Sequence, residues 1–216
     1  TSTKVGVYIN EQPLCVSTIR HTVEELMQYE QIIDQHDFRQ QLVIDWLKAN
    51  DIPFEFDAII GRGGLIKPIP GGVYRVNRKM VYETYYALRK HACNLGCIIA
   101  YELAKQQQNG CKAYIADPVT VDELLPEARV SGSPLMPRLA IWHALNQRAI
   151  ARRYASEIDS RYEDLNLIIC HLGGGISIAA HQKGRAVDAN NALDGEGPLS
   201  PERAGTLPAA DLIHLC

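Results

Sequence analysis

The residues whose types and spacing best suit chemistry lie between positions 165 and 208. His171 ends the apolar run LNLIIC, and three consecutive glycines, Gly173, Gly174 and Gly175, begin two residues after it. A turn without Cβ atoms permits positive φ and lets consecutive backbone N–H groups converge on an anion. Such a turn could cradle a phosphoryl group beside an imidazole. A tight hairpin without a ligand needs the same glycines, so this pattern alone leaves both interpretations open.

A polar loop follows the glycines. It gathers acidic, amide and basic side chains at Asp188, Asn190, Asn191, Asp194, Glu196, Glu202 and Arg203. Polar loops just after core strands often carry active sites, and a solvated connector is the alternative. The planar guanidinium of Arg203 could pair with a carboxylate or a phosphoryl group. A surface ion pair with Glu202 or Asp194 is the competing interpretation.

Four further candidates stand at the ends of predicted elements. Asp117 follows the strand CKAYIA at 111–116, where a carboxylate could hold hydrated magnesium, orient a substrate or cap the next segment. Arg62 ends a buried strand within the flexible stretch GRGG, which permits close approach by a ligand. His91 and Asn94 mark a helix junction, and packing or capping is the simpler role for each.

The elements that must position these residues form a mixed α/β pattern. KVGVYI and LCVSTI around the turn NEQP predict a hairpin. Periodicity predicts helices over 23–50, 78–91, 94–108 and 139–158, and strands over 57–61 and 111–116. His21 and His143 fall in loop or helical context without evident partners, and we interpret both as structural.

The stretch from 165 to 189 is predicted as strand, glycine turn, strand, short turn and strand. A Walker-type or Rossmann phosphate loop would lead into a helix, so both of those folds are disfavoured. The opening TSTKVGVYINEQPLCVS can be laid over GGISIAAHQKGRAVDAN without gaps, strand on strand and turn on turn. A duplication would put two phosphate-holding hairpins in similar halves. Because any two hairpins look alike, the duplication stays an open interpretation.

Composition limits the partners. The 216 residues are 46% hydrophobic and carry a formal net charge of -3, so no overall basic field exists for a nucleic acid. No apolar run approaches the roughly 20 residues that a membrane span needs. Six cysteines lack the dense spacing of a secreted scaffold. We therefore expect a cytoplasmic protein that contacts neither nucleic acid nor membrane. The absence of an initial Met leads us to expect that the start of the protein is missing.

The segment HLGGGISIAAHQKGRAVDANNALDGEGPLSPERAGTLP closely resembles the signature region of the acetate, propionate and butyrate kinase family, and of its butyrate kinases in particular. The resemblance extends along the chain through TSTKVGVY, EFDAIIGRGGLIKPIPGGVY, HACNLG, YIADPVTVDEL and RVSGSPLMPR. It implies the duplicated ribonuclease-H-like α/β fold shared by actin, sugar kinases and heat-shock chaperone ATPases. Residues 1–160 would form the acyl-substrate domain. Residues 161–216 would be the first hairpins of a nucleotide-binding domain whose remainder we expect to be missing.

The resemblance also implies an activity. The family transfers the ATP γ-phosphoryl group to a short-chain carboxylate, here butanoate, with Mg²⁺ as cofactor, and the full-length protein would be a homo-oligomer. A branched acid such as isobutyrate is the alternative substrate, since one methylene or branch is worth only about 1 to 3 kcal/mol. A second alternative is not an enzyme at all: the chain could be an inactive truncated fragment that serves only as a binding or folding module.

Residue roles follow at matching positions. By resemblance, His171 is the phosphoryl-stabilising histidine, and Arg203 is the arginine that neutralises the transferring group. Asp117 is similar to the aspartate associated with magnesium and the acyl substrate. Acetate kinases resemble this stretch but have an arginine followed by His-Gly-Gly. In GRGG, Arg62 stands in the place of that histidine, and we assign it a catalytic role.

The remaining assignments concern binding. His91 resembles a substrate-side histidine of acetate kinases, with a loop spacing that differs by one residue, and Asn94 is grouped with it. The resemblance assigns phosphate or nucleotide binding to Ser2, Thr3, Lys4, Gly173, Gly174, Gly175 and Ser177.

Overall fold

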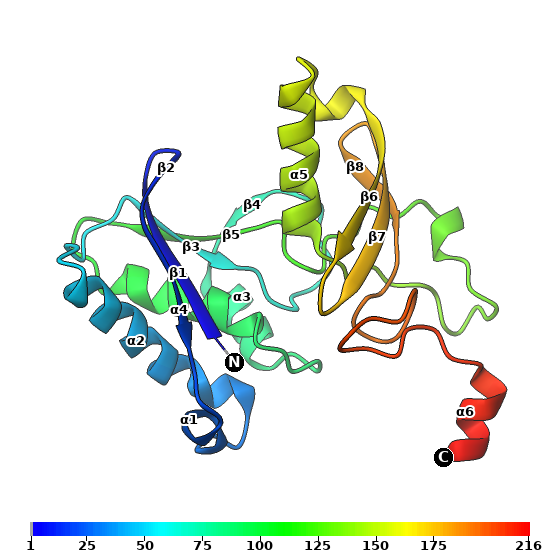
Figure 1. Ribbon diagram of the computed structural model, residues 1–216, viewed down its shortest axis with the longest axis horizontal. Coiled ribbons are helices and arrows are strands. Elements are labelled where there is room, and N and C mark those ends of the chain that lie inside the picture. Colours follow the sequence, from blue (N-terminus) through cyan, green and yellow to red (C-terminus); the bar gives the residue numbers. More distant parts are fainter. Residues whose placement is uncertain (1) are drawn as a thin grey trace. The chain divides into compact units, whose positions relative to one another are not determined.

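The computed structural model describes residues 2–216 (Figure 1). The chain forms two compact units. Unit 1 comprises the chain up to Gly64 together with Arg75–Ile115, and unit 2 comprises Leu65–Tyr74 and Ala116–Cys216. Each unit thus combines two separate stretches of the chain, whereas the sequence predicts a single division between residues 160 and 161. That domain division stays a prediction.

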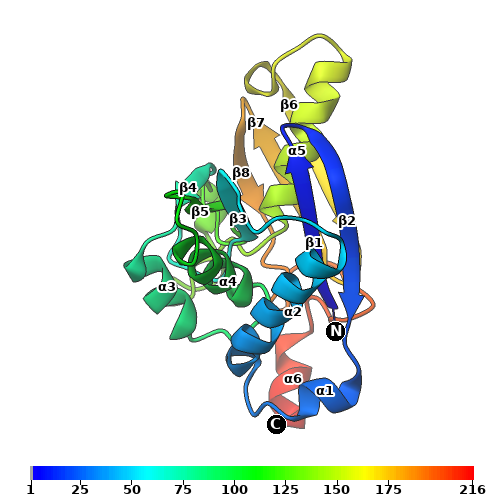
Figure 2. The ribbon, with the colours of Figure 1, turned by 90° about the vertical axis from the view of Figure 1, so that its left-hand side faces the viewer.

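Unit 1 opens with the predicted hairpin. Strand β1 (Ser2–Ile9) pairs antiparallel with β2 (Gln12–Arg20), and Figure 2 shows the two strands side by side as a long hairpin. Asn10 in the connecting turn has a φ of 55°, a conformation that Asn tolerates better than most residues. Alternation of side chains along both strands was sufficient to predict this element.

The helix predicted over 23–50 is interrupted. It forms α1 (Val23–Met27), a 3-10 turn (Ile32–Gln35) and α2 (His36–Ala49). Thr22 caps α1 through a reciprocal pair of hydrogen bonds with Glu25, and the Asp34 carboxylate accepts the Gln31 N–H at 3.0 Å. Two separate helix starts within this stretch replace the single continuous helix.

The other helices of unit 1 are shorter than predicted; one of them packs on a strand of a small sheet and the other packs on that helix. These are α3 (Arg78–Tyr85) and α4 (Asn94–Lys105). Strands β3 (Ala58–Arg62), β4 (Val73–Arg75) and β5 (Lys112–Ala116) pair in the order β3, β5, β4. The apolar stripe of α4 buries Leu95, Ile98, Ile99 and Leu103 in a core that also includes Ile59 of β3. This packing sets the first turn of α4 against the end of β3.

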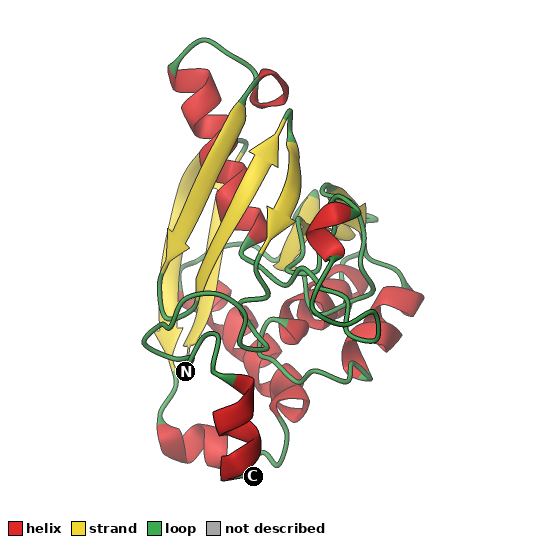
Figure 3. Ribbon diagram, turned by 90° about the vertical axis from the view of Figure 1, so that its right-hand side faces the viewer, coloured by secondary structure: helices red, strands yellow, loops and turns green. Residues whose placement is uncertain are grey.

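Unit 2 carries the predicted strand, glycine turn, strand pattern. Strands β6 (Asn166–Leu172), β7 (Ile176–Gln182) and β8 (Arg185–Ala189) form an antiparallel sheet, drawn in yellow in Figure 3. The turn from β7 to β8 has positive φ at Lys183 and Gly184. In the gapless overlay Lys183 falls on Asn10, so the two hairpin turns occupy matching columns. The duplication itself stays a prediction.

Helix α5 (Ala144–Glu157) packs against this sheet. Its buried stripe is Ala144, Gln147, Arg148, Ala151 and Ala155, which follows helical spacing. The predicted helix start at 139 was five residues early. Trp142 explains the difference, because its backbone N–H donates to the Val119 carbonyl and its indole N–H to the Val121 carbonyl. These bonds hold the segment before α5 outside the helix.

The remaining elements of unit 2 are short. Two 3-10 turns, Glu127–Arg129 and Tyr162–Asp164, and helix α6 (Ala209–Leu215) complete it. Trp142 lies in a core of small side chains that includes Ala179, Ala186 and Ala189 of the sheet. Across residues 2–216, no helix combines the length and apolarity needed to cross a bilayer.

Candidate active site

The glycine turn joins β6 to β7 across three residues. Leu172 pairs with Ile176, so Gly173, Gly174 and Gly175 alone make the connection. The positive φ that these glycines permit is not used, because none of the three has one. Because the glycines lack Cβ atoms, neighbouring side chains can approach the turn closely. A Cβ on Gly174 would meet the Glu202 carboxylate at 2.6 Å, and a Cβ on Gly175 would collide with the Arg203 guanidinium.

A tight turn carrying Arg203 is bonded to the glycine turn. The Ser200 hydroxyl donates to the Gly174 carbonyl at 2.7 Å, and the Glu202 N–H donates to the same oxygen at 3.0 Å. The Ser200 N–H closes the turn on the Arg203 carbonyl at 2.8 Å. These bonds hold the guanidinium of Arg203 over Gly175. The structure thus brings together two candidates that lie 28 residues apart in the sequence.

His171, at the end of β6, stacks on His143. The two imidazole rings are parallel within 3°, with centroids 3.7 Å apart. Asn146 Nδ2 lies 2.9 Å from His171 Nδ1. The Cε1 atom of His143 is 3.4 Å from the position a Cβ on Gly175 would take. His143 was expected to lack partners, and this part of the expectation is wrong, since its ring contacts His171 and Ser177. Its interpretation as a structural residue stays a prediction.

Ser177, the second residue of β7, is fully buried. Its hydroxyl oxygen lies 2.9 Å from His143 Nδ1 and 2.9 Å from Gln147 Nε2, and it accepts the His143 backbone N–H at 3.1 Å. The assignment of Ser177 to phosphate binding stays a prediction. In this arrangement the Ser177 hydroxyl contacts the ring of His143.

The loop that follows β8 is ordered largely by its own polar side chains. Asn190 bonds the backbone of β7 and the Glu196 carbonyl, and the Asn191 side chain accepts the Leu193 and Asp194 N–H groups. Arg138 pairs with Asp188 at 3.0 Å and with Glu196 at 2.6 Å. These polar residues shape the loop that delivers the 200–203 turn to the glycines.

Asp117, directly after β5, is 5% exposed and has a φ of 36°. Its carboxylate accepts the Gly72 N–H at 2.8 Å and lies 3.0 Å from Arg148 Nε and 3.4 Å from Arg152 Nη1. Arg148 also pairs with the buried Glu123 at 3.3 Å. These contacts replace the capping alternative with a buried ion-pair network.

The surroundings of Asp117 do not fit a directly bound cation. Two guanidinium groups and an amide N–H already face its oxygens, and positive charge beside a carboxylate opposes metal ligation. Among residues 2–216 no group of three or more His, Cys, Asp or Glu side chains is arranged to hold a metal ion. The magnesium role of Asp117 stays a prediction.

Arg62 belongs to unit 1, where glycines permit very close packing of a strand on a helix. A Cβ on Gly61 would collide with the Gly96 carbonyl, and a Cβ on Gly96 would meet the Arg62 carbonyl at 2.5 Å. Arg62 also lines a cavity of about 480 Å³ together with Thr3 and Lys4. The structure therefore groups three predicted site residues within this unit.

His91 and Asn94 organise the start of α4. The Cys93 N–H donates to His91 Nδ1 at 3.1 Å, and the Asn94 N–H donates to the His91 carbonyl at 3.0 Å. The side chain of Asn94 is buried and donates to the Arg89 carbonyl at 3.3 Å. The N-cap residue of α4 is Cys93, without a side-chain cap bond, so these contacts fit packing better than capping. The substrate-binding roles stay predictions. Burial raises the pKa of the Cys93 thiol to about 11, as for a core cysteine.

Ser2, Thr3 and Lys4 begin β1, and a buried arginine holds two of them. Arg39 Nη1 donates to the Ser2 carbonyl and to Thr3 Oγ1, both at 2.9 Å. His21 Nε2 lies 2.8 Å from the same hydroxyl. Burial, and then the positive charge of Arg39, lower the pKa of His21. His21 therefore serves the backbone next to the predicted phosphate-binding residues, consistent with a structural role.

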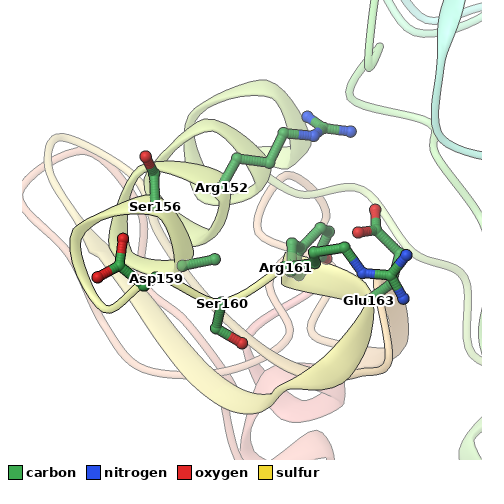
Figure 4. A pocket seen from close by; sticks show the side chains of 8 residues that line it. Arg152, Ser156, Asp159, Ser160, Arg161 and Glu163 are labelled. Atoms are coloured by element: carbon green, nitrogen blue, oxygen red, sulfur yellow. The ribbon is translucent and has the colours of Figure 1, made fainter.

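A further open cavity of about 460 Å³ lies at the C-terminal end of α5 (Figure 4). Its two arginines, Arg152 and Arg161, are already paired with Asp117 and Asp164, at 3.4 and 2.9 Å. None of the candidates named from the sequence lines it. The candidates His171 and Arg203 lie instead at the glycine turn.

Comparison with solved structures identifies the fold. The acetate kinase of Porphyromonas gingivalis superposes with a TM-score of 0.62 at 17% identity, covering 93% of this chain and 51% of that one. A propionate kinase of Francisella tularensis gives a TM-score of 0.62 at 15% identity, covering 95% of this chain and 52% of that one. The chain therefore has the fold of the acetate and propionate kinases, and the expected fold class is confirmed.

Sequence comparison identifies the family. Residues 139–215 match the acetokinase family. The chain is 67% identical over 216 residues to a probable butyrate kinase of Bacteroides thetaiotaomicron, and 50% identical over 218 residues to butyrate kinase 1 of Clostridium acetobutylicum. It is covered completely in both and spans 61% of each relative. Residues 139–215 thus match the acetokinase family model, and the whole chain is similar to proteins named butyrate kinase.

Proposed function

We propose that the protein transfers the γ-phosphoryl group of ATP to the carboxylate of butanoate, giving ADP and butanoyl phosphate. The observation that carries the proposal is the meeting of the stacked rings of His143 and His171 with the guanidinium of Arg203 at the turn Gly173–Gly175. The similarity to two proteins named butyrate kinase supports the choice of acid.

The reaction explains these residue types. One carboxylate oxygen attacks the γ-phosphorus, a phosphorus–oxygen bond forms, and the bond to the oxygen that bridges the β- and γ-phosphates breaks. The carboxylate is already ionised at neutral pH, so no base needs to remove a proton. Two anions must approach each other, and catalysis therefore consists of positioning and of hydrogen-bond donors aimed at the transferring oxygens.

Within unit 2 each residue then has a definite task. His171 and His143 donate hydrogen bonds to the equatorial oxygens, and Arg203 neutralises their negative charge. The backbone N–H groups of Gly173–Gly175 hold the phosphate chain. Asp117 orients Arg148 and Arg152 instead of touching the reacting atoms.

Unit 1 supplies further binding residues in this proposal. Ser2, Thr3 and Lys4 bind phosphate, with Arg39 fixing the first two. Arg62, which shares a cavity with Thr3 and Lys4, places a positive charge beside an anionic ligand bound in that cavity. His91 and Asn94 shape the acid-binding side through the first turn of α4.

The cofactor Mg²⁺ would supply, when bound together with the nucleotide, positive charge that offsets the charge developing during transfer. The residues around Asp117 do not favour a protein-bound ion, so no step of the proposal passes through one. We further propose a cytoplasmic homo-oligomer. The proposal that it binds neither nucleic acid nor membrane is supported by the net charge of -3, which provides no overall basic field.

The test is ADP formation, measured with a coupled assay across acetate, propionate, butyrate and isobutyrate. The assay is run on this chain and on a protein of the full length of its relatives. Preference for butyrate supports the proposal, and preference for isobutyrate assigns a branched-chain acid instead. Activity in the longer protein alone identifies this chain as an inactive part of such a kinase. Absence of transfer in both rejects the proposal.

A further inference from the structure

A chain of buried polar side chains runs through unit 2 and ends at the ring of His143. Its members are Tyr162, His181, Gln147 and Ser177, each 2% exposed or less. Tyr162 Oη lies 2.6 Å from His181 Nδ1, and His181 Nε2 lies 3.1 Å from Gln147 Oε1. Polar groups at this depth need partners, so the direction of every hydrogen bond matters.

The amide of Gln147 fixes that direction. Its Nε2 atom lies 3.0 Å from the Ser177 carbonyl oxygen, which can only accept. The nitrogen therefore faces Ser177, and Oε1 faces His181. Because Oε1 is an acceptor, His181 must donate from Nε2. Its Nδ1 then accepts the hydroxyl proton of Tyr162.

A neutral His181 satisfies every contact in this part of the chain. Burial lowers its pKa to about 4, in agreement with the single ring proton that the contacts require. Trp142 packs edge-on against the ring, with centroids 5.6 Å apart, and helps to exclude water. The upstream part of the chain is thus locked in one protonation pattern.

The hydroxyl of Ser177 transmits this pattern to His143. Its oxygen accepts one bond from Gln147 Nε2 at 2.9 Å and one from the His143 backbone N–H at 3.1 Å. A hydroxyl oxygen has two lone pairs, and both are then in use. Its one remaining capacity is to donate, and the acceptor in reach is His143 Nδ1 at 2.9 Å.

We propose that Ser177 is a positioning residue that, backed by Gln147 and His181, holds His143 in the tautomer whose proton is on Nε2. An Nδ1 proton would require Ser177 to accept a third hydrogen bond. The importance of this tautomer for catalysis rests on the proposed function, because an Nε2–H group is a donor to a phosphoryl oxygen. Ser177 then acts on phosphate only through His143.

The first test needs no substitution. Two-bond ¹H–¹⁵N correlation spectra of the ¹⁵N-labelled protein distinguish a protonated ring nitrogen from an unprotonated one. His143→Gln identifies the signals of His143 by their loss. We expect one neutral tautomer with the proton on Nε2. A proton on Nδ1, or an even mixture of both tautomers, would overturn the proposal.

The second test breaks the last link. In Ser177→Ala we expect the His143 signals to shift to a mixture of both tautomers. Thr120→Val is the matched control, since Thr120 Oγ1 is buried in the same unit and has no hydrogen-bond partner among the described residues. A single Nε2–H tautomer in the alanine variant would contradict the proposal, as would an equal change in the control.

Activity provides a third readout. Ser177→Ala should lower kcat about 10- to 100-fold while the KM for ATP changes by less than about twofold, as expected for loss of a supporting partner. An equal rise in KM would contradict the positioning role. If the wild-type protein transfers phosphate to none of the acids, the proposed function fails. The tautomer spectra still decide the inference in that case.

Discussion

His143 and His171 lie face to face, with ring centroids 3.7 Å apart and an interplanar angle of 3°. His143 directly precedes the first turn of α5, whereas His171 ends β6, so packing of this helix on this sheet sets their spacing. Two positive imidazolium rings at this distance would repel each other. The position of each ring depends on the packing of α5 against β6.

Removing the ring of His171 should reduce turnover without unfolding the protein. Loss of one donor to developing charge typically costs about 100- to 1000-fold in kcat, and we expect His171→Ala to fall in this range. His214→Ala, on the exposed face of α6, is the control and should leave kcat unchanged. Steady-state kinetics with butyrate gives the comparison. A kcat within twofold of wild type, about 0.4 kcal/mol, would exclude a direct role for His171.

A methyl group at position 175 should act like the loss of Arg203. In Gly175→Ala the new Cβ occupies the place of the guanidinium, so Arg203 must move. We expect both Gly175→Ala and Arg203→Ala to lower kcat about 100-fold while nucleotide affinity changes little. Gly132→Ala is the matched control, because no atom lies within 4 Å of its added Cβ. Nucleotide binding by calorimetry, compared with kcat, distinguishes the two effects, and equal losses in both would argue against a transition-state role.

Stability should fall in mild acid because of His181. Its pKa is about 4 in the folded protein and 6.5 unperturbed, so the unfolded chain binds the proton more readily. The contribution of neutral His181 to the stability of the folded protein is therefore present above pH 6.5 and is lost as the pH falls toward 4. We expect the free energy of unfolding to drop by about 2 kcal/mol between pH 7 and pH 5 from this residue.

Urea unfolding at both pH values measures this drop. His181→Gln should reduce the pH dependence, whereas His214→Gln, which alters an exposed residue, should retain it. The same slope in the His181 variant and the wild type would show that another group is responsible.

The buried Arg39 should contribute strongly to stability. Two of its nitrogens bind Gln35 Oε1, at 3.1 and 2.9 Å, and a third binds Ser2 and Thr3. Arg39→Met leaves the buried Gln35 acceptor and the part-buried acceptors of Ser2 and Thr3 without donors, which we expect to cost about 2 to 4 kcal/mol. Arg153→Met removes an exposed pair with Glu157 and should cost less than about 0.5 kcal/mol. Equal losses measured by chemical denaturation would contradict the special role of Arg39.

Local patterns predicted the parts of the fold in which neighbours in sequence are neighbours in space. Both hairpins were predictable because strand alternation and turn residues are local signals. The division of the stretch 23–50 was not, because two capping interactions override its periodicity. The late start of α5 depends on bonds from Trp142 to Val119 and Val121, more than 20 residues away.

The candidate site divides in the same way. His171, the glycine turn and Arg203 were found because they lie in one distinctive segment. His143 and Gln147 were missed, because only tertiary packing brings α5 to the end of β6. A signal was present in the sequence. Gln147 and Arg148 interrupt a stripe of alanines at helical spacing, and polar residues on a buried stripe indicate a network.

The contact between Gly61 and Gly96 has a consequence for any mutational survey of this protein. Neither residue has a side chain to touch a ligand, yet a Cβ on either one would strike the backbone of the other element. In a saturation library we expect both positions to tolerate almost nothing but glycine. Both positions would then resemble catalytic residues in such a survey, although the constraint on them is the close packing of β3 against α4.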